Sequence, residues 1–235
     1  MRSTGLFAGI HLAGNALLLW LGYYWLGLGE SRAGALLWSM AVAALLVCLA
    51  CWLYGAGFAF FAQRRVGAAF RAALRNLAPL VVAAIAVVAV YALLARARDA
   101  MDNPGFRLAS WLTLHLRKPV KPATVQAVFH GAFWVLRWVV VPVLILPIGP
   151  GIVSRGWAGF GAVGARCRVW LYWLEAPALL LIALCAPLKL VAWVPHMHSF
   201  GGEMASFVLR AAAAYLLFAA GWLGLAFVSR EEKGV

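Results

Sequence analysis

Acidic side chains are scarce in this sequence, and charge of any kind is sparse. Only 7 of the 235 residues are Asp or Glu, and charged residues make up 11% of the chain. There is no dense carboxylate cluster that could hold Mg²⁺ for prenyl or phosphoryl transfer. The zinc-protease pattern H-E-x-x-H, the hydrolase pattern G-x-S-x-G and the Walker A loop are also absent. No activity is assigned by a motif, and any cofactor is unknown.

Apolar residues, in contrast, fill long stretches of the chain. They make up 66% of the sequence, and the mean hydropathy is +0.91, far above the range of soluble domains. A helix needs about 20 apolar residues to cross a bilayer, and the alternating pattern of a membrane barrel is missing. We therefore predict an all-α fold, a single integral membrane domain over residues 1–235 that forms a bundle of about six spans. The spans are expected near residues 6–28, 36–60, 77–95, 127–147, 169–194 and 204–228.

Two segments between the spans have an amphipathic pattern. In residues 63–76, apolar side chains recur every four residues among four arginines. In residues 96–126, a helix start at Asp102 precedes an apolar face, and Pro119 and Pro122 are expected to stop the helix. We predict that both segments lie at the membrane surface.

The net charge of +13 comes from Lys and Arg in short segments beside the apolar runs, not from one basic domain. This pattern indicates topology signals and lipid headgroup contacts, and it argues against nucleic-acid binding. With six spans, the side that holds the termini has 10 basic residues and the opposite side has 7. Because Lys and Arg are in excess on the cytoplasmic side, we predict both termini in the cytoplasm of a bacterial-type inner membrane. The first apolar run has no convincing cleavage site and is expected to be retained.

Most of the titratable loop residues fall on the side opposite the termini. Four of the five histidines lie there, and so do four of the seven acidic residues. A site that faces water is therefore expected on this side. The histidines are His115, His130, His196 and His198.

Four ionisable residues fall within predicted spans, where an unpaired charge is costly: Arg137, Glu175, Lys189 and Arg210. Lys189 and Arg210 lie one to two turns from a membrane face, so the favoured interpretation is that they extend to the headgroups. Arg137 and Glu175 lie deeper, within about 5 Å of each other in depth at 1.5 Å per residue. We hypothesise an ion pair between them. The alternative is that Glu175 reaches Arg168 while Arg137 faces a wet crevice.

Histidines and cysteines could form metal or redox sites, but each group also has a simpler interpretation. His196 and His198 with Glu203, and with His130 as a further ligand, offer imidazole and carboxylate groups that suit zinc, and Met197 adds a copper ligand. Alternate histidines in a loop are more often plain interfacial residues. Cys48 and Cys51 form a C-x-x-C inside a span, where apolar packing is favoured over redox chemistry. The glycines of G-x-G-x-x-G, which begins at Gly159, follow no strand and are expected to give flexibility.

Prolines within the fourth and fifth spans give the clearest indication of function. Interrupted helices expose polar backbone at membrane depth, as transporters require. The favoured function is a small transporter or a membrane-embedded subunit of a larger complex, with membrane lipid and a protein as partners. The alternatives are a scaffold and a membrane enzyme, which acts on lipid with or without a metal and has its site on the histidine-bearing side.

Overall fold

The chain is an all-helical integral membrane protein. The computed structural model describes residues 2–29, 31–195 and 199–230, and these contain helices and turns but no strand. Six helical stretches within them are long and apolar enough to cross a membrane, as predicted. They cover Ser3–Leu26, Ala33–Gln63, Leu77–Ala100, Pro122–Ala162, Tyr172–Ala192 and Phe200–Val228.

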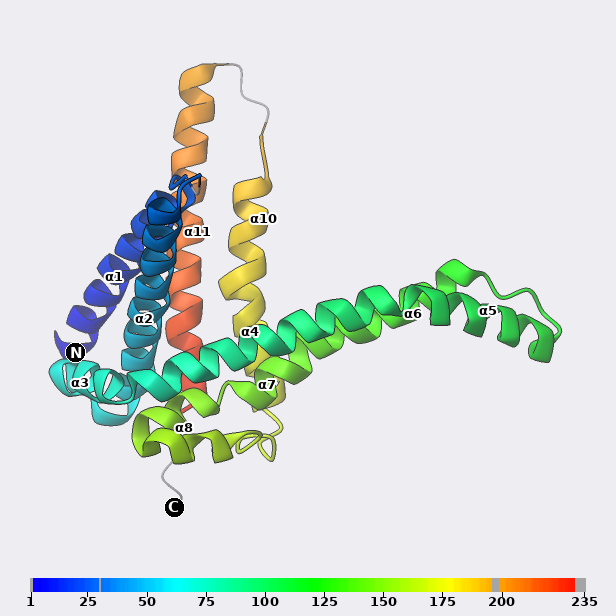
Figure 1. Cartoon of the computed structure of the whole chain (residues 1–235), viewed down its shortest axis with the longest axis horizontal. Coiled ribbons are helices and arrows are strands. Elements are labelled where there is room, and N and C mark those ends of the chain that lie inside the picture. The colour runs from blue at the N-terminus through cyan, green and yellow to red at the C-terminus, as the bar shows by residue number, and fades with distance from the viewer. Residues whose placement is uncertain (1, 30, 196–198, 231–235) are drawn as a thin grey trace.

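Three long helices form the centre of the molecule, and a fourth, interrupted helix lies beside them (Figure 1). The first helix begins and the last helix ends at the same end of this bundle (Figure 1). An even number of spans requires this arrangement. The three helices are α1 (Arg2–Leu26), α2 (Ala33–Gln63) and α11 (Phe200–Val228), and the fourth consists of α9 (Tyr172–Leu180), η3 (Leu181–Cys185) and α10 (Ala186–Ala192).

Two short helices close that end of the bundle, which we call the base. They are α3 (Val66–Arg75) and α8 (Ile148–Arg155). The Phe7 and Phe60 rings stack here with centroids 4.1 Å apart, next to the fully buried Ile152. α3 is the predicted amphipathic segment: it buries alanines against the core, and its arginines are exposed. Its helical state is confirmed, and its position at the membrane surface stays a prediction.

A helical hairpin projects from the bundle (Figure 1). Its first arm is α4 (Leu77–Ala100) followed by α5 (Asp102–Leu116), and its second arm begins with α6 (Pro122–Val135). α5 starts at Asp102 and ends before Pro119, as predicted. Pro122 does not stop a helix but starts α6, because proline lacks only an N–H that is unpaired at a first helical position. Of the described side chains in residues 91–135, which we call the hairpin tip, only Gly105, Ala109 and Val125 are buried.

Prolines interrupt the fourth and fifth apolar stretches, as expected. The π-helical segment η1 (Leu136–Val140) ends two residues before Pro142, and η3 ends two residues before Pro187. A proline ring clashes with the carbonyl four residues back, and a widened π-turn relieves that clash. After η1 the chain continues as α7 (Val141–Ile145).

The glycine-rich segment after α7 is largely helical, and its flexibility stays a prediction. It forms α8 and a 3₁₀ helix, η2 (Gly156–Ala162), which fold back on each other. A Cβ atom at Gly159 would overlap the backbone of Gly151 and Ile152. Gly159 is therefore required for close backbone approach.

Candidate functional site

Arg137 does not form the hypothesised ion pair with Glu175. No salt bridge joins them in the described residues, and none joins Glu175 to Arg168. The Arg137 guanidinium instead lies over the rings of Tyr91 and Trp138, 6.0 and 5.4 Å from their centroids. Glu175 lies in the first turn of α9, where the helix dipole favours a negative charge. Equal depth along two helices was a poor guide, because it does not tell which way each side chain points.

Arg210 has a structural partner that the sequence did not indicate. It is buried, and its guanidinium donates to the carbonyls of Val191 and Trp193. α10 ends at Ala192, so these carbonyls lie where a helix leaves its last acceptors unpaired. Arg210 therefore caps α10 instead of extending to the headgroups. Lys189 is exposed and makes no hydrogen bond or ion pair within the described chain, which is compatible with the predicted extension.

Those predicted metal ligands that the structure describes do not lie close together. His196 and His198 lie outside the described residues. Glu203 lies in the first turn of α11, whereas His130 lies in α6, in a distant part of the molecule (Figure 1). The described part of the chain contains no group of three or more His, Cys, Asp or Glu that could hold a metal ion. His115, another histidine of the side on which a site was predicted, stacks on Trp111 of its own helix, with ring centroids 4.0 Å apart.

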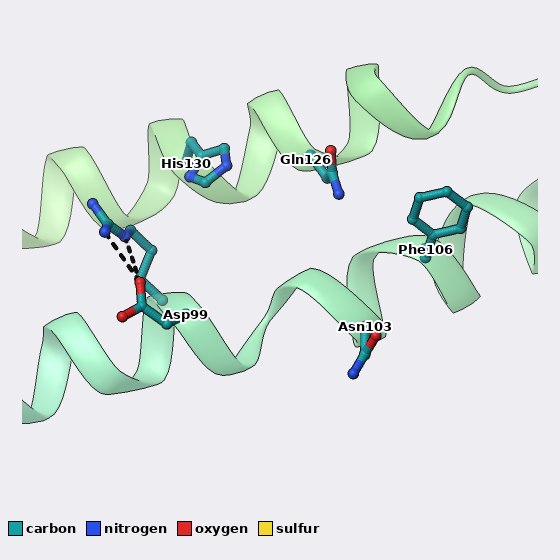
Figure 2. A pocket seen from close by; sticks show the side chains of 6 residues that line it. Asp99, Asn103, Phe106, Gln126 and His130 are labelled. Atoms are coloured by element: carbon teal, nitrogen blue, oxygen red, sulfur yellow. Dashed lines mark hydrogen bonds and ion pairs between the residues drawn. The ribbon is translucent and has the colours of Figure 1, made fainter.

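A polar pocket lies between the two arms of the hairpin, and we call it the polar notch. It has a volume of about 550 Å³ and is lined by Arg98, Asp99, Asn103, Phe106, Gln126 and His130. Nε and Nη2 of Arg98 both donate to Oδ1 of Asp99, at 3.2 and 3.1 Å. Figure 2 shows Gln126 and His130 on the opposite arm, while Asn103 points away from that arm. The notch thus combines one ion pair with two polar side chains from the facing helix.

A second pocket, which we call the apolar cavity, lies between the hairpin and the bundle. It has a volume of about 470 Å³. α2, α4, α7, the start of α8 and Trp222 of α11 form its walls, and none of its lining residues is charged. Aliphatic side chains dominate, among them Val47, Leu80, Val87 and Ile145.

The notch and the cavity follow one another along α4. On α4, Tyr91 lines the cavity and Arg98 lines the notch. Seven residues are two helical turns, so both side chains project from one face about 10 Å apart along the axis. The Tyr91 hydroxyl donates to the carbonyl of Arg137 at 2.9 Å, which fixes α4 to η1 between the two pockets.

Buried polar side chains on α1 and α2 lie behind the cavity. The Tyr54 hydroxyl donates to Oδ1 of Asn15 at 2.7 Å, and the Asn15 amide donates to the carbonyl of His11 at 2.8 Å. His11 is fully buried, and neither ring nitrogen has a hydrogen-bond partner. The Tyr54 ring packs 4.6 Å from Trp222, and both residues line the cavity. The sequence had marked His11 and Asn15 only as polar residues within a span.

Most of the residues in these pockets were missed from the sequence. Of the candidate residues that the sequence suggested, His130 lines the notch, and Cys51, for which apolar packing was favoured, lines the cavity. The one available signal was that Arg98 and Gln126 mark the limits of two apolar runs. Comparison with known proteins gave no match to a family model, a curated protein or a solved structure. What the chain does must be inferred from its own residues.

Proposed function

We propose that this chain is a small membrane transporter whose substrate passes through the apolar cavity. The observation that carries the proposal is the position of the cavity beside an interrupted helix. Four of the six apolar stretches contribute to its walls, and Pro142, just after the π-helical segment η1, is among its lining residues. A helix interrupted in this way can change its bend at a defined point, which a transporter needs in order to open and close.

The chemistry of the cavity selects the kind of substrate. Its volume falls in the range of small-molecule sites, roughly 300–1,000 Å³. Because the lining has no charged residue, an ion or a strongly polar solute would lose its hydration without compensation. The part of the substrate that enters the cavity is therefore apolar, as in an aliphatic chain.

A second candidate function is favoured by a different observation. The hairpin tip has little buried surface, although it projects well beyond the bundle (Figure 1). Such an arm suits a membrane-embedded subunit that contacts another protein. The metal-dependent enzyme stays a prediction, because His196 and His198 lie outside the described residues.

Reconstitution in liposomes tests the transporter. The purified chain would be inserted into vesicles that contain a fluorescent NBD-labelled lipid, and movement between leaflets would be followed as the fraction bleached by external dithionite. We expect faster movement than in protein-free vesicles. The labelled lipids would be phosphatidylglycerol, phosphatidylcholine and glucosylceramide, so that charge and phosphate vary separately.

Matched variants on α4 connect this activity to the cavity. Ala84 lines the cavity, whereas Ala86 is exposed and does not. We expect Ala84→Trp to abolish lipid movement by filling the cavity and Ala86→Trp to preserve it, provided that both proteins elute as single species and keep their melting temperature. If no labelled lipid moves faster than in protein-free vesicles, the chain is not a lipid transporter. A copurifying protein would then support the second candidate function, a membrane-embedded subunit. Equal activity of the two variants would exclude the cavity as the route.

A further inference from the structure

The polar notch lies at the end of a long apolar run. α4 has no charged residue from Leu77 to Ala95, a length of about 28 Å. Arg98 follows three residues later. On the opposite arm, Gln126 and His130 lie at the start of the apolar part of α6. Both arms thus change from apolar to polar at the notch.

Unused hydrogen-bond donors are available there. A guanidinium has five N–H groups, and Arg98 uses only its Nε and Nη2 nitrogens in the contact with Asp99. The side chains of Gln126 and His130 make no hydrogen bond within the described chain. An arginine fork, which can be joined by amide and imidazole N–H groups, is a common means of binding a phosphate group.

Asp99 is the one lining group that opposes an anion, and its pairing is easily broken. The side chains of Arg98 and Asp99 are 49% and 68% exposed. Exposed pairs of this kind are weak, whereas an arginine can bind phosphate through two parallel hydrogen bonds. Asp99 therefore competes with a phosphate for Arg98 without blocking the notch.

The charge around the notch favours the same ligand. Residues 96–121 contain six basic and two acidic side chains, a net charge of +4. Basic residues near a membrane attract anionic lipid surfaces. The notch is thus placed in a segment that concentrates anionic headgroups.

We infer that the polar notch binds the phosphate of an anionic lipid headgroup while an acyl chain of the same molecule extends into the apolar cavity. This inference rests on the proposed function for the movement of that lipid, but binding can be measured without it. The spacing supports a single ligand, because Arg98 and Tyr91 project from one face of α4 about 10 Å apart. Tyr91, held to η1 by its hydrogen bond, marks the passage from headgroup to chain.

Binding is tested first, by the melting temperature of the protein in neutral detergent. A ligand that binds only the folded state raises this temperature. We expect an increase with phosphatidylglycerol, a smaller one in Arg98→Gln and a larger one in Asp99→Asn, because the latter frees the guanidinium. Arg107→Gln is the matched control, since Arg107 is exposed on α5 outside the notch. It should respond like the unaltered protein.

Further ligands separate the possible sources of the phosphate. Equal stabilisation by inorganic phosphate alone would show that a free anion, not a lipid, is the ligand. Equal stabilisation by glucosylceramide, or equal loss in Arg98→Gln and Arg107→Gln, would overturn the inference. An unchanged or weaker response in Asp99→Asn would contradict the competition between Asp99 and phosphate.

The liposome assay then separates failure of this inference from failure of the transporter. We expect faster movement of phosphatidylglycerol than of glucosylceramide, and we expect Arg98→Gln to abolish that preference. Equal movement of all labelled lipids would support the transporter proposal and refute selection of the headgroup by the notch. If phosphatidylglycerol stabilises the protein in a way that depends on Arg98 but no lipid moves, the binding site would be supported and lipid transport refuted.

Discussion

The base of the bundle and the hairpin tip are both helical, but only the base is closely packed. At the base, Phe60, Ala69 and Ile152 are completely buried. The most apolar window of α4 has a mean hydropathy of 2.7 and is 11% buried, whereas that of α11 has 1.9 and is 28% buried. Apolar character therefore does not decide how closely a helix packs in this molecule.

Small residues account for the close packing. Gly55 approaches Leu80 and Ala73, and Gly221 approaches the backbone of Ala183. Glycine and alanine let helices come near enough for many van der Waals contacts, which are the main attraction between helices in lipid. The hairpin tip has few such contacts and contains the polar notch instead. We infer that the base holds the fold, and that the tip is free to bind and to move.

The largest effect is expected at Gly159, within the base. Gly159→Ala would force a Cβ atom into the backbone of Gly151 and Ile152, which cannot move aside as a side chain can. Overpacking usually costs about 1–3 kcal/mol, and an overlap with backbone should reach or exceed the upper value. The measurement is the yield of monodisperse protein and its melting temperature in detergent.

Gly161→Ala provides the control for this substitution. Gly161 lies two residues away in the same 3₁₀ helix, and a Cβ atom there would meet nothing within 4 Å. We expect its stability to stay within about 0.5 kcal/mol of the original protein. If Gly159→Ala behaved like Gly161→Ala, the close packing of the base would not stabilise the fold.

A smaller effect is expected where Arg210 caps α10. Arg210→Met would leave the carbonyls of Val191 and Trp193 without their donor, at a cost of about 1–3 kcal/mol for buried groups. Lys189→Met removes a charge from an exposed position without removing a hydrogen bond, so it should change stability by about 0.5 kcal/mol or less. Urea unfolding of both variants in the same detergent checks the difference. Equal losses would mean that charge, not capping, is what Arg210 contributes.

The sequence predicted the helices far better than the pockets, and the reason is physical. Spans depend on local apolar length, so six could be recognised from residues that are neighbours in the chain. The interruptions at Pro142 and Pro187 were also local, because a proline acts on its own helix. The base could not be foreseen, since Gly159 matters only because Ile152 folds back against it.

The notch could not be predicted from the sequence, for a related reason. Arg98 and His130 are 32 residues apart and belong to no motif, so only the pairing of the two arms brings them together. The predicted ion pair between Arg137 and Glu175 was wrong for a different reason. Their depths along two helices were compared, but the direction of each side chain around its helix was unknown. Arg137 faces Tyr91 and Trp138 instead.

The smallest effect on stability is expected in the hairpin tip, which has few buried side chains compared with the base. Asp99→Asn breaks the Arg98 salt bridge, yet both side chains are largely exposed, so stability should change by about 0.5 kcal/mol or less. The same substitution should increase stabilisation by phosphatidylglycerol, because Arg98 loses its competitor. Melting temperatures with and without that lipid give both quantities. A large loss of stability without lipid would show that this salt bridge, which joins neighbouring residues of α4, stabilises the helix, and the tip would then contribute to the stability of the fold.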